Sequence, residues 1–132
     1  MIETTTDGAS PFIHHLACGQ VTIEEIIQAV VASRHVTGLA ELWDFGRAGP
    51  LFALSKIYDL SRSHDRVWLD QVLSDVPNRA SAWLATSGLN RTVLEQFLDE
   101  SGMWSDWRVF TDMNTAFHWL TDSGHRSDSP VS

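Results

Sequence analysis

The fold is clearest in the run Trp107-Arg108-Val109-Phe110-Thr111-Asp112-Met113-Asn114-Thr115-Ala116-Phe117-His118-Trp119-Leu120. It reads as a short buried strand that passes directly into a helix, with Asp112 at the junction. The Asp112 carboxylate can accept hydrogen bonds from the free amides of the first helical turn. The apolar residues that follow share one helical face, namely Met113, Ala116, Phe117 and Leu120. A strand capped into a terminal helix is typical of a small layered α/β protein.

Another helix start lies in the run Val21-Thr22-Ile23-Glu24-Glu25-Ile26. Thr22 and Glu25 have the spacing of a capping box, in which each side chain bonds the backbone N–H of the other residue. Val21 and Ile26 have the spacing of a hydrophobic staple. Because an apolar stripe of helical period follows, the pattern predicts a helix over 23–33.

The remaining elements follow from apolar runs and turn signals. Besides the strand before Asp112, strands are predicted at 2–6, 11–18, 39–45 and 81–86. Helical patterns are expected at about 52–76 and from 87–88 to Gly102. The order ββαβαβαβα indicates an α/β protein, with a single, mostly parallel five-stranded mixed sheet and helices packed on it. The first strand is expected to be an antiparallel edge, because a hairpin joins it to the second.

Size and composition favour one globular domain. The chain has 132 residues, of which 43% are hydrophobic and 20% charged. We predict a domain at 1–120 and a disordered polar tail at 121–132. No apolar run approaches the length of about 18 residues that a membrane helix needs. Residues 1–7 lack the features of a signal peptide, so we expect a cytoplasmic protein without a membrane partner.

The charge is strongly acidic, with 17 acidic residues against 9 basic ones and a net charge of −8. Nucleic acids and anionic membranes bind clusters of Lys and Arg, and the sequence contains no such cluster. We therefore expect no nucleic-acid partner. The acidity favours solubility and gives a weak indication of a basic partner.

Five features, taken in order along the chain, resemble the SpoIIAA-like proteins, which are relatives of the STAS domain. They are the N-terminal hairpin, the helix entry at 19–26, Leu42-Trp43-Asp44-Phe45, Ala82-Trp83-Leu84-Ala85, and Arg108-Val109-Phe110 leading to 116–120. The resemblance covers residues 2–120. It implies an α/β domain that works by binding, often as an interaction module, and that is sometimes compared with lipid-binding SEC14 domains.

One departure from that family concerns its regulation. Phosphoregulated STAS domains carry an Asp-Ser-Ser-Gly type of motif after the third strand, and the serine is the switch. This chain has Gly46-Arg47-Ala48-Gly49-Pro50 at that position, without a hydroxyl group. Since the nearest later serine is Ser55, the resemblance supports the fold and not the phosphorylation switch.

No motif with specific catalytic chemistry is present. His14 and His15 are adjacent in a predicted strand, so they point to opposite faces and cannot chelate one ion. Cys18 stands between Ala17 and Gly19 without a catalytic signature and reads as a small buried thiol. We therefore expect no enzyme activity, no metal and no cofactor.

Two groups of residues remain as candidates for a ligand site or an interface. The carboxyl ends of parallel strands are where open α/β sheets bind ligands, and there the sequence places Asp44, Arg47, Ser87 and Asp112. The alternative for Ser87 and Asp112 is a helix cap. Six tryptophans form the second group. Two of them, Trp43 and Trp83, are predicted to be core, while three are candidates for exposure at an interface or ligand pocket, namely Trp68, Trp104 and Trp107.

Taken together, the sequence predicts a non-enzymatic STAS-like domain that acts through protein contact, with another protein or as a homodimer. The alternative is a carrier of an apolar small molecule or lipid, with a pocket under the helical region at 52–76. An exposed apolar patch would favour the first function, and an internal apolar cavity of about 300 Å³ or more would favour the second.

Overall fold

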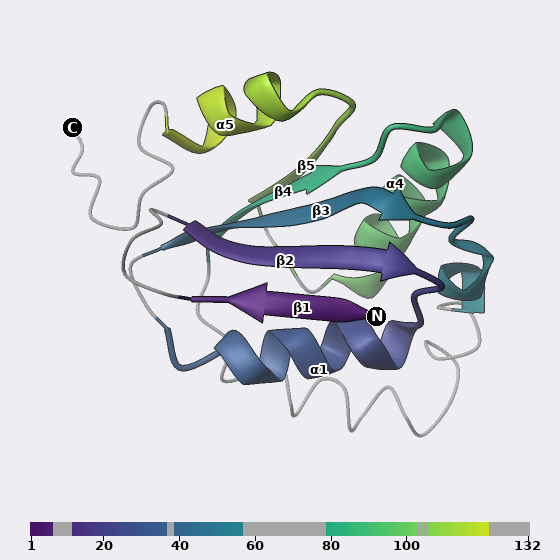
Figure 1. Ribbon diagram of the computed structural model, residues 1–132, viewed down its shortest axis with the longest axis horizontal. Coiled ribbons are helices and arrows are strands. Elements are labelled where there is room, and N and C mark those ends of the chain that lie inside the picture. Colours follow the sequence, from purple (N-terminus) through teal and green to yellow (C-terminus); the bar gives the residue numbers. More distant parts are fainter. Residues whose placement is uncertain (7–11, 37–38, 57–78, 103, 105, 122–132) are drawn as a thin grey trace.

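The computed structural model describes residues 1–6, 12–36, 39–56, 79–102, 104 and 106–121. The strands are β1 (Ile2–Thr5), β2 (Phe12–Gly19), β3 (Ala40–Ala48), β4 (Ala80–Leu84) and β5 (Asp106–Phe110). The helices are α1 (Ile23–Ser33), the 3₁₀ helix η1 (Phe52–Lys56), α4 (Gly88–Ser101) and α5 (Met113–Thr121). Figure 1 shows them as layers on a twisted sheet.

The strands form one mixed sheet in the order β1-β2-β3-β4-β5. β1 pairs antiparallel with β2, and the other neighbouring strands are parallel. The α/β class, the mixed five-stranded sheet and the antiparallel edge are thereby confirmed.

The helices cover the two faces of the sheet unequally. α1 and α4 pack on one face, here called the α1/α4 face, where they enclose Trp43, Phe45 and Trp83. α5 packs on the other face, here called the α5 face, against Leu42 and Ala82. Side chains alternate between faces along each strand, so β2, β3, β4 and β5 contribute to both layers.

The helix ends follow the local sequence signals. Thr22 N donates to Glu25 Oε1 at 3.0 Å and Glu25 N donates to Thr22 Oγ1 at 3.2 Å, so the predicted capping box is formed at the start of α1. At the end of α4, Gly102 has a φ of +64°. That left-handed conformation suits glycine because it lacks a Cβ.

Several expectations need correction. β3 continues to Ala48, past the junction expected at 46–50. The helical region at 52–76 begins as a 3₁₀ helix, and residues 57–78 lie outside the described residues. The expected tail also lies outside them from residue 122 onward, while Thr121 ends α5. Phe117, which the sequence places on the apolar face of the last helix, is 41% exposed, and Leu89 of α4 is 45% exposed.

The extension of β3 has a local cause. Leu16 pairs with Asp44, but Cys18 pairs with Arg47, so β3 holds one more residue than β2 over this interval. An extra residue in one strand is a β-bulge, which re-aims the side chains that follow it. Because paired residues share a face, Arg47 lies on the α5 face with Leu16 and Cys18.

Candidate functional site

The polar residues predicted at the carboxyl ends of the strands are engaged in local structure. Asp44 Oδ1 accepts a hydrogen bond from the backbone N–H of Gly46 at 2.9 Å. A Cβ at Gly46 would stand 3.1 Å from the same oxygen, so glycine permits this tight turn. Ser87 Oγ accepts from the Asn90 N–H at 3.1 Å and caps α4.

Asp112 caps α5 in the same way. Its Oδ2 accepts from Thr115 N at 2.9 Å and from Thr115 Oγ1 at 2.8 Å. These hydrogen bonds, the backbone one first, hold the pKa of the Asp112 carboxyl below its usual range because they favour the charged form. Asp112 also borders a hollow of about 150 Å³ with Arg91 and Thr115. The cap interpretation of Ser87 and Asp112 is confirmed, and Asp44, Ser87 and Asp112 each bond within their own segment.

The described tryptophans of the sheet and its loops are mostly buried in the core. Trp43 and Trp83 are fully buried, as expected for central strands. The expectation of an exposed Trp104 is wrong, since it is 7% exposed and packs in the core. Trp107 is half-buried against the same core, and Trp68 lies outside the described residues.

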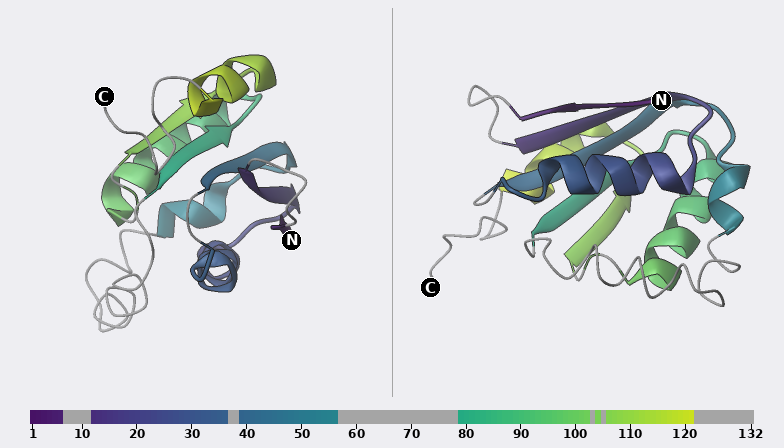
Figure 2. Two further views of the ribbon diagram at one scale, coloured as in Figure 1. Left: turned by 90° about the vertical axis from the view of Figure 1, so that its left-hand side faces the viewer. Right: turned by 90° about the horizontal axis from the view of Figure 1, so that it is seen from below.

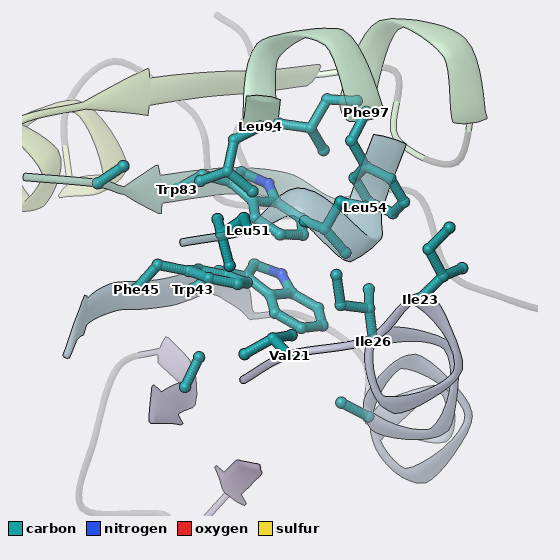
Figure 3. Packing of buried hydrophobic residues seen from close by; sticks show 14 of the residues in the cluster. Val21, Ile23, Ile26, Trp43, Phe45, Leu51, Leu54, Trp83, Leu94 and Phe97 are labelled. Atoms are coloured by element: carbon teal, nitrogen blue, oxygen red, sulfur yellow. The ribbon is translucent and has the colours of Figure 1, made fainter. Parts of the chain in front are cut away.

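The α1/α4 face contains a column of stacked aromatic rings, which belongs to a cluster of buried side chains that the sequence analysis did not predict. The His15 ring stacks on Trp43 with centroids 3.7 Å apart, and Trp43 stacks on Trp83 at 4.5 Å and an angle of 2°. Trp104 meets both indoles edge-on, at 5.8 and 4.9 Å. Figure 3 shows the two stacked indoles between the side chains of α1 and α4.

The buried carboxylate of Glu41 connects this column. Glu41 Oε1 accepts from Trp43 Nε1 at 2.7 Å, and Oε2 accepts from Trp104 Nε1 at 3.3 Å. His15 Nε2 lies 3.7 Å from Glu41 Oε1 and has no hydrogen-bond partner among the residues that the structure describes. Glu41 is 4% exposed and His15 is fully buried. The carboxylate therefore fixes two indoles and faces one imidazole.

Two further side chains contact these rings. Ser81 Oγ accepts from Trp83 Nε1 at 2.6 Å, and Thr4 Oγ1 lies 2.9 Å from His15 Nδ1. The six side chains other than Thr4 are hereafter the aromatic–carboxylate cluster: His15, Glu41, Trp43, Ser81, Trp83 and Trp104. Its polar side chains resemble a set for acid–base chemistry, but complete burial of His15 and Ser81 separates them from any substrate in solution.

Arg79 stands beside this cluster, immediately before β4. Its Nη2 donates to the Val36 carbonyl at 2.6 Å. Burial lowers the pKa of the Arg79 guanidinium, and the Glu41 carboxylate partly opposes that effect by favouring the charged form. Arg79 thus supplies positive charge near the buried carboxylate and ties the start of β4 to the end of α1.

The sequence did contain a signal for the cluster. Glu41 is a charged residue inside an otherwise apolar run that predicts a central strand. A carboxylate there must be hydrogen-bonded, because burying an unpaired charge is costly. The sequence also predicted correctly that His14 and His15 face opposite sides of the sheet, which places one of the two imidazoles on the same face as Glu41. Within the described ranges, no group of three or more His, Cys, Asp or Glu is placed to hold a metal ion.

The α5 face differs because its β1–β2 half is open. Leu42, Ala82 and Leu84 under α5 are at most 5% exposed. The next strand outward carries three half-buried side chains on this face, hereafter the β2 strip: His14, Leu16 and Cys18. Figures 1 and 2 show α5 set towards β4 and β5 and away from β1. The β2 strip is thus a half-buried surface beside a covered one, with apolar side chains at Leu16 and Cys18 and an imidazole at His14, whose Nε2 is buried without a hydrogen-bond partner among the described residues.

A hollow of about 280 Å³ lies between β1 and α1. Its lining mixes apolar and polar side chains, from Met1, Ile2, Thr4, Glu25, Gln28, Ala29 and Ala32. Thr4 connects this hollow to the aromatic–carboxylate cluster, because its hydroxyl contacts His15.

No family model and no curated protein matches the chain. The chain is similar to a crystal structure of an uncharacterized protein of the DUF3478 family with a SpoIIAA-like fold, from Shewanella loihica PV-4. The sequences are 15% identical, the TM-score is 0.49, and the match covers 91% of this chain and 92% of that chain.

Proposed function

We propose that this chain is a non-enzymatic protein-interaction domain whose partner binds on the open half of the α5 face. The observation that carries the proposal is the β2 strip, where Leu16 and Cys18 remain half-buried beside fully covered neighbours. β2 is parallel to β3, and parallel strands are normally covered on both faces, whereas an antiparallel edge such as β1 can face water. A partner that covers this half would remove apolar surface from water, which favours association.

The absence of an enzyme activity is part of the proposal. The side chains suited to acid–base chemistry are buried in the aromatic–carboxylate cluster. Those at the carboxyl ends of the strands are engaged as caps and turns. Both arrangements stabilise the fold. No helix in the described part of the chain is long and apolar enough to cross a membrane, and the proposed partner is a protein.

The second candidate function is a carrier of a small apolar molecule. The hollow of about 280 Å³ between β1 and α1 favours it, since ligand pockets begin at roughly 300 Å³. Its lining includes Glu25 and Gln28, which are polar groups that an apolar ligand would have to desolvate. The pocket predicted under 52–76 falls mostly on residues outside the described ones.

Affinity capture from a lysate of the source organism tests the two functions. The variant Leu16→Gln removes the centre of the β2 strip, and Leu89→Gln is the matched control because Leu89 is an exposed apolar residue on α4. We expect a stoichiometric protein that wild type and Leu89→Gln retain and Leu16→Gln loses. Native mass spectrometry of the purified chain covers the alternative. If a small molecule copurifies and no captured protein depends on Leu16, the carrier function is supported in place of the interaction function.

A further inference from the structure

We propose that the partner surface is a basic amphipathic helix, which lies along the β2 strip beside α5 with a leucine-type side chain against Leu16. This inference rests on the interaction function proposed above and adds the shape and charge of the partner.

The spacing of the sheet favours a helix in this place. α5 packs against β4 through Ala80, Ala82 and Leu84. β2 lies two strands from β4, a distance of about 9.6 Å at the usual strand spacing. Two packed helices stand about 8–10 Å apart. A second helix in van der Waals contact with α5 would therefore lie directly over β2.

The flank of α5 supplies a wall for such a helix. Phe117 is 41% exposed and stacks on Phe12 of β2 with ring centroids 5.6 Å apart. The aromatic pair closes one end of the β2 strip and leaves part of the Phe117 ring accessible at its side. A docked helix could bury that ring together with Leu16, and aromatic side chains at such positions are common anchors of interfaces.

The negative charge on both sides of Leu16 favours a basic helix. The register places Glu3 of β1 and Asp44 of β3 on either side of Leu16 in one cross-strand row. Glu3 is exposed and Asp44 is half-buried. Lys or Arg flanking the apolar stripe of a helix would meet these two carboxylates, and the net charge of −8 adds long-range attraction.

Arg47 favours one direction for a helix that lies along the strip. It pairs with Cys18 on the same face, at the carboxyl end of β2. A cation at this end favours the negative end of a helix dipole. The docked helix would therefore place its C-terminus near Arg47 and run antiparallel to α5.

The same charges disfavour a second copy of this chain as the occupant. Setting Leu16 against Leu16 in a two-fold dimer brings the row of Glu3 and Asp44 against an identical row. Like charges placed opposite each other destabilise an interface. Both copies also carry a net charge of −8. The homodimer is thereby an outcome that opposes this inference.

The test uses the full chain and two synthetic amphipathic peptides of about 14 residues, long enough to span the strip. The peptides share one leucine face and differ only in carrying lysine or glutamate on the flanks. Binding is measured by titration calorimetry, with amide chemical shifts to locate the contact. We expect the lysine peptide to bind about tenfold or more tightly than the glutamate peptide, and less tightly as salt rises.

Two variants with matched controls locate the contact. Leu16→Gln should weaken the lysine peptide about tenfold, whereas Leu89→Gln on α4 should not. Glu3→Lys should weaken it about fivefold, whereas Asp99→Lys makes the same change in net charge on α4 and should have a smaller effect. Glu3 and Asp99 are both exposed, so neither variant threatens the fold.

Several outcomes would overturn the inference. They are equal affinity for the two peptides, no binding of either, lysine-peptide binding that ignores Leu16, and a dimer abolished by Leu16→Gln. Partner capture that still depends on Leu16 would then leave the interaction function standing with a different partner chemistry. Capture that ignores Leu16 would remove both.

Discussion

The two faces of one sheet use polar residues in opposite ways. On the α1/α4 face, Glu41 and Ser81 are buried and accept hydrogen bonds from three indoles, and the buried His15 ring stacks on Trp43. On the α5 face, Glu3 and Asp44 flank Leu16 in the β2 strip, which remains half-buried. The side chains that most resemble a catalytic set therefore stabilise the interior, and the α5 face carries the surface to which we propose that a partner binds.

The physical reason lies in the cost of burial. A buried carboxylate without partners is strongly unfavourable, so Glu41 requires the donors that Trp43 and Trp104 supply. Those bonds specify one arrangement of the column, and a partner would have to break them to reach it. Half-buried Leu16 carries no such requirement. The following predictions test this difference, beginning with the largest effect.

Trp83→Ala should cost about 3–5 kcal/mol of folding free energy, because it removes a fully buried indole from the centre of the aromatic column. Leu16→Ala on the open half should cost about 1 kcal/mol, since less apolar area is lost there. Urea denaturation of both variants measures the difference. Equal effects would show that the two faces are packed alike, contrary to the structure.

Glu41→Ala should destabilise the protein by about 2–3 kcal/mol, because it leaves the indole N–H groups of Trp43 and Trp104 without an acceptor. Glu41→Gln keeps an acceptor oxygen and should cost less. Glu3→Ala removes an exposed carboxylate from the other face and should change stability by no more than about 0.5 kcal/mol. The thermal midpoint, followed by tryptophan fluorescence, orders the three variants. A stabilised Glu41→Ala protein would mean that the carboxylate is a net cost to the fold.

Local signals predicted the fold well. The capping box at Thr22, the cap at Asp112 and the glycine at Gly102 each act within one turn of helix, so the sequence around them is sufficient. The limit of β3 was wrong because it depends on a bulge against β2, which is a contact between distant segments. The exposure of Phe117 was missed because helical periodicity does not tell how wide a face of α5 the sheet covers.

The candidate site was less predictable for the same reason. Trp104 follows a helix and reads as a loop residue, yet it reaches Glu41 across 63 positions. The cluster joins β2, β3, β4 and the segment before β5, so only the strand order brings its members together. Periodicity identifies which residues share a face of one strand. It does not identify which residues of different strands become neighbours.

The two residues of the capping box at the start of α1 can be compared in the same way, with smaller expected changes in stability. Thr22→Ala should cost about 1 kcal/mol, because the Glu25 N–H loses its side-chain acceptor. Glu25→Ala should cost less, since the Thr22 N–H that it leaves is exposed to water. Chemical denaturation measures both variants. An unchanged midpoint for Thr22→Ala would mean that burial of α1 alone fixes its start.

The smallest expected change in stability concerns the Asp112 cap of α5, and it depends on pH. Hydrogen bonds from Thr115 depress the pKa of Asp112 in the folded protein, so the unfolded chain binds the proton more readily. The resulting stabilisation is complete above the unfolded pKa of about 3.9 and is lost as pH falls through the lower folded value. Asp112→Asn keeps a cap acceptor but cannot titrate. Its stability should therefore fall less than that of wild type between pH of about 6 and about 2.5, and carboxyl NMR should place the Asp112 titration below its usual range. Because Asp112 is fully exposed, water and salt weaken the interaction, and the difference should be smaller than that of Thr22→Ala. Identical acid limbs in both proteins, with a normal Asp112 titration, would show that the α5 cap contributes no charge-dependent stability.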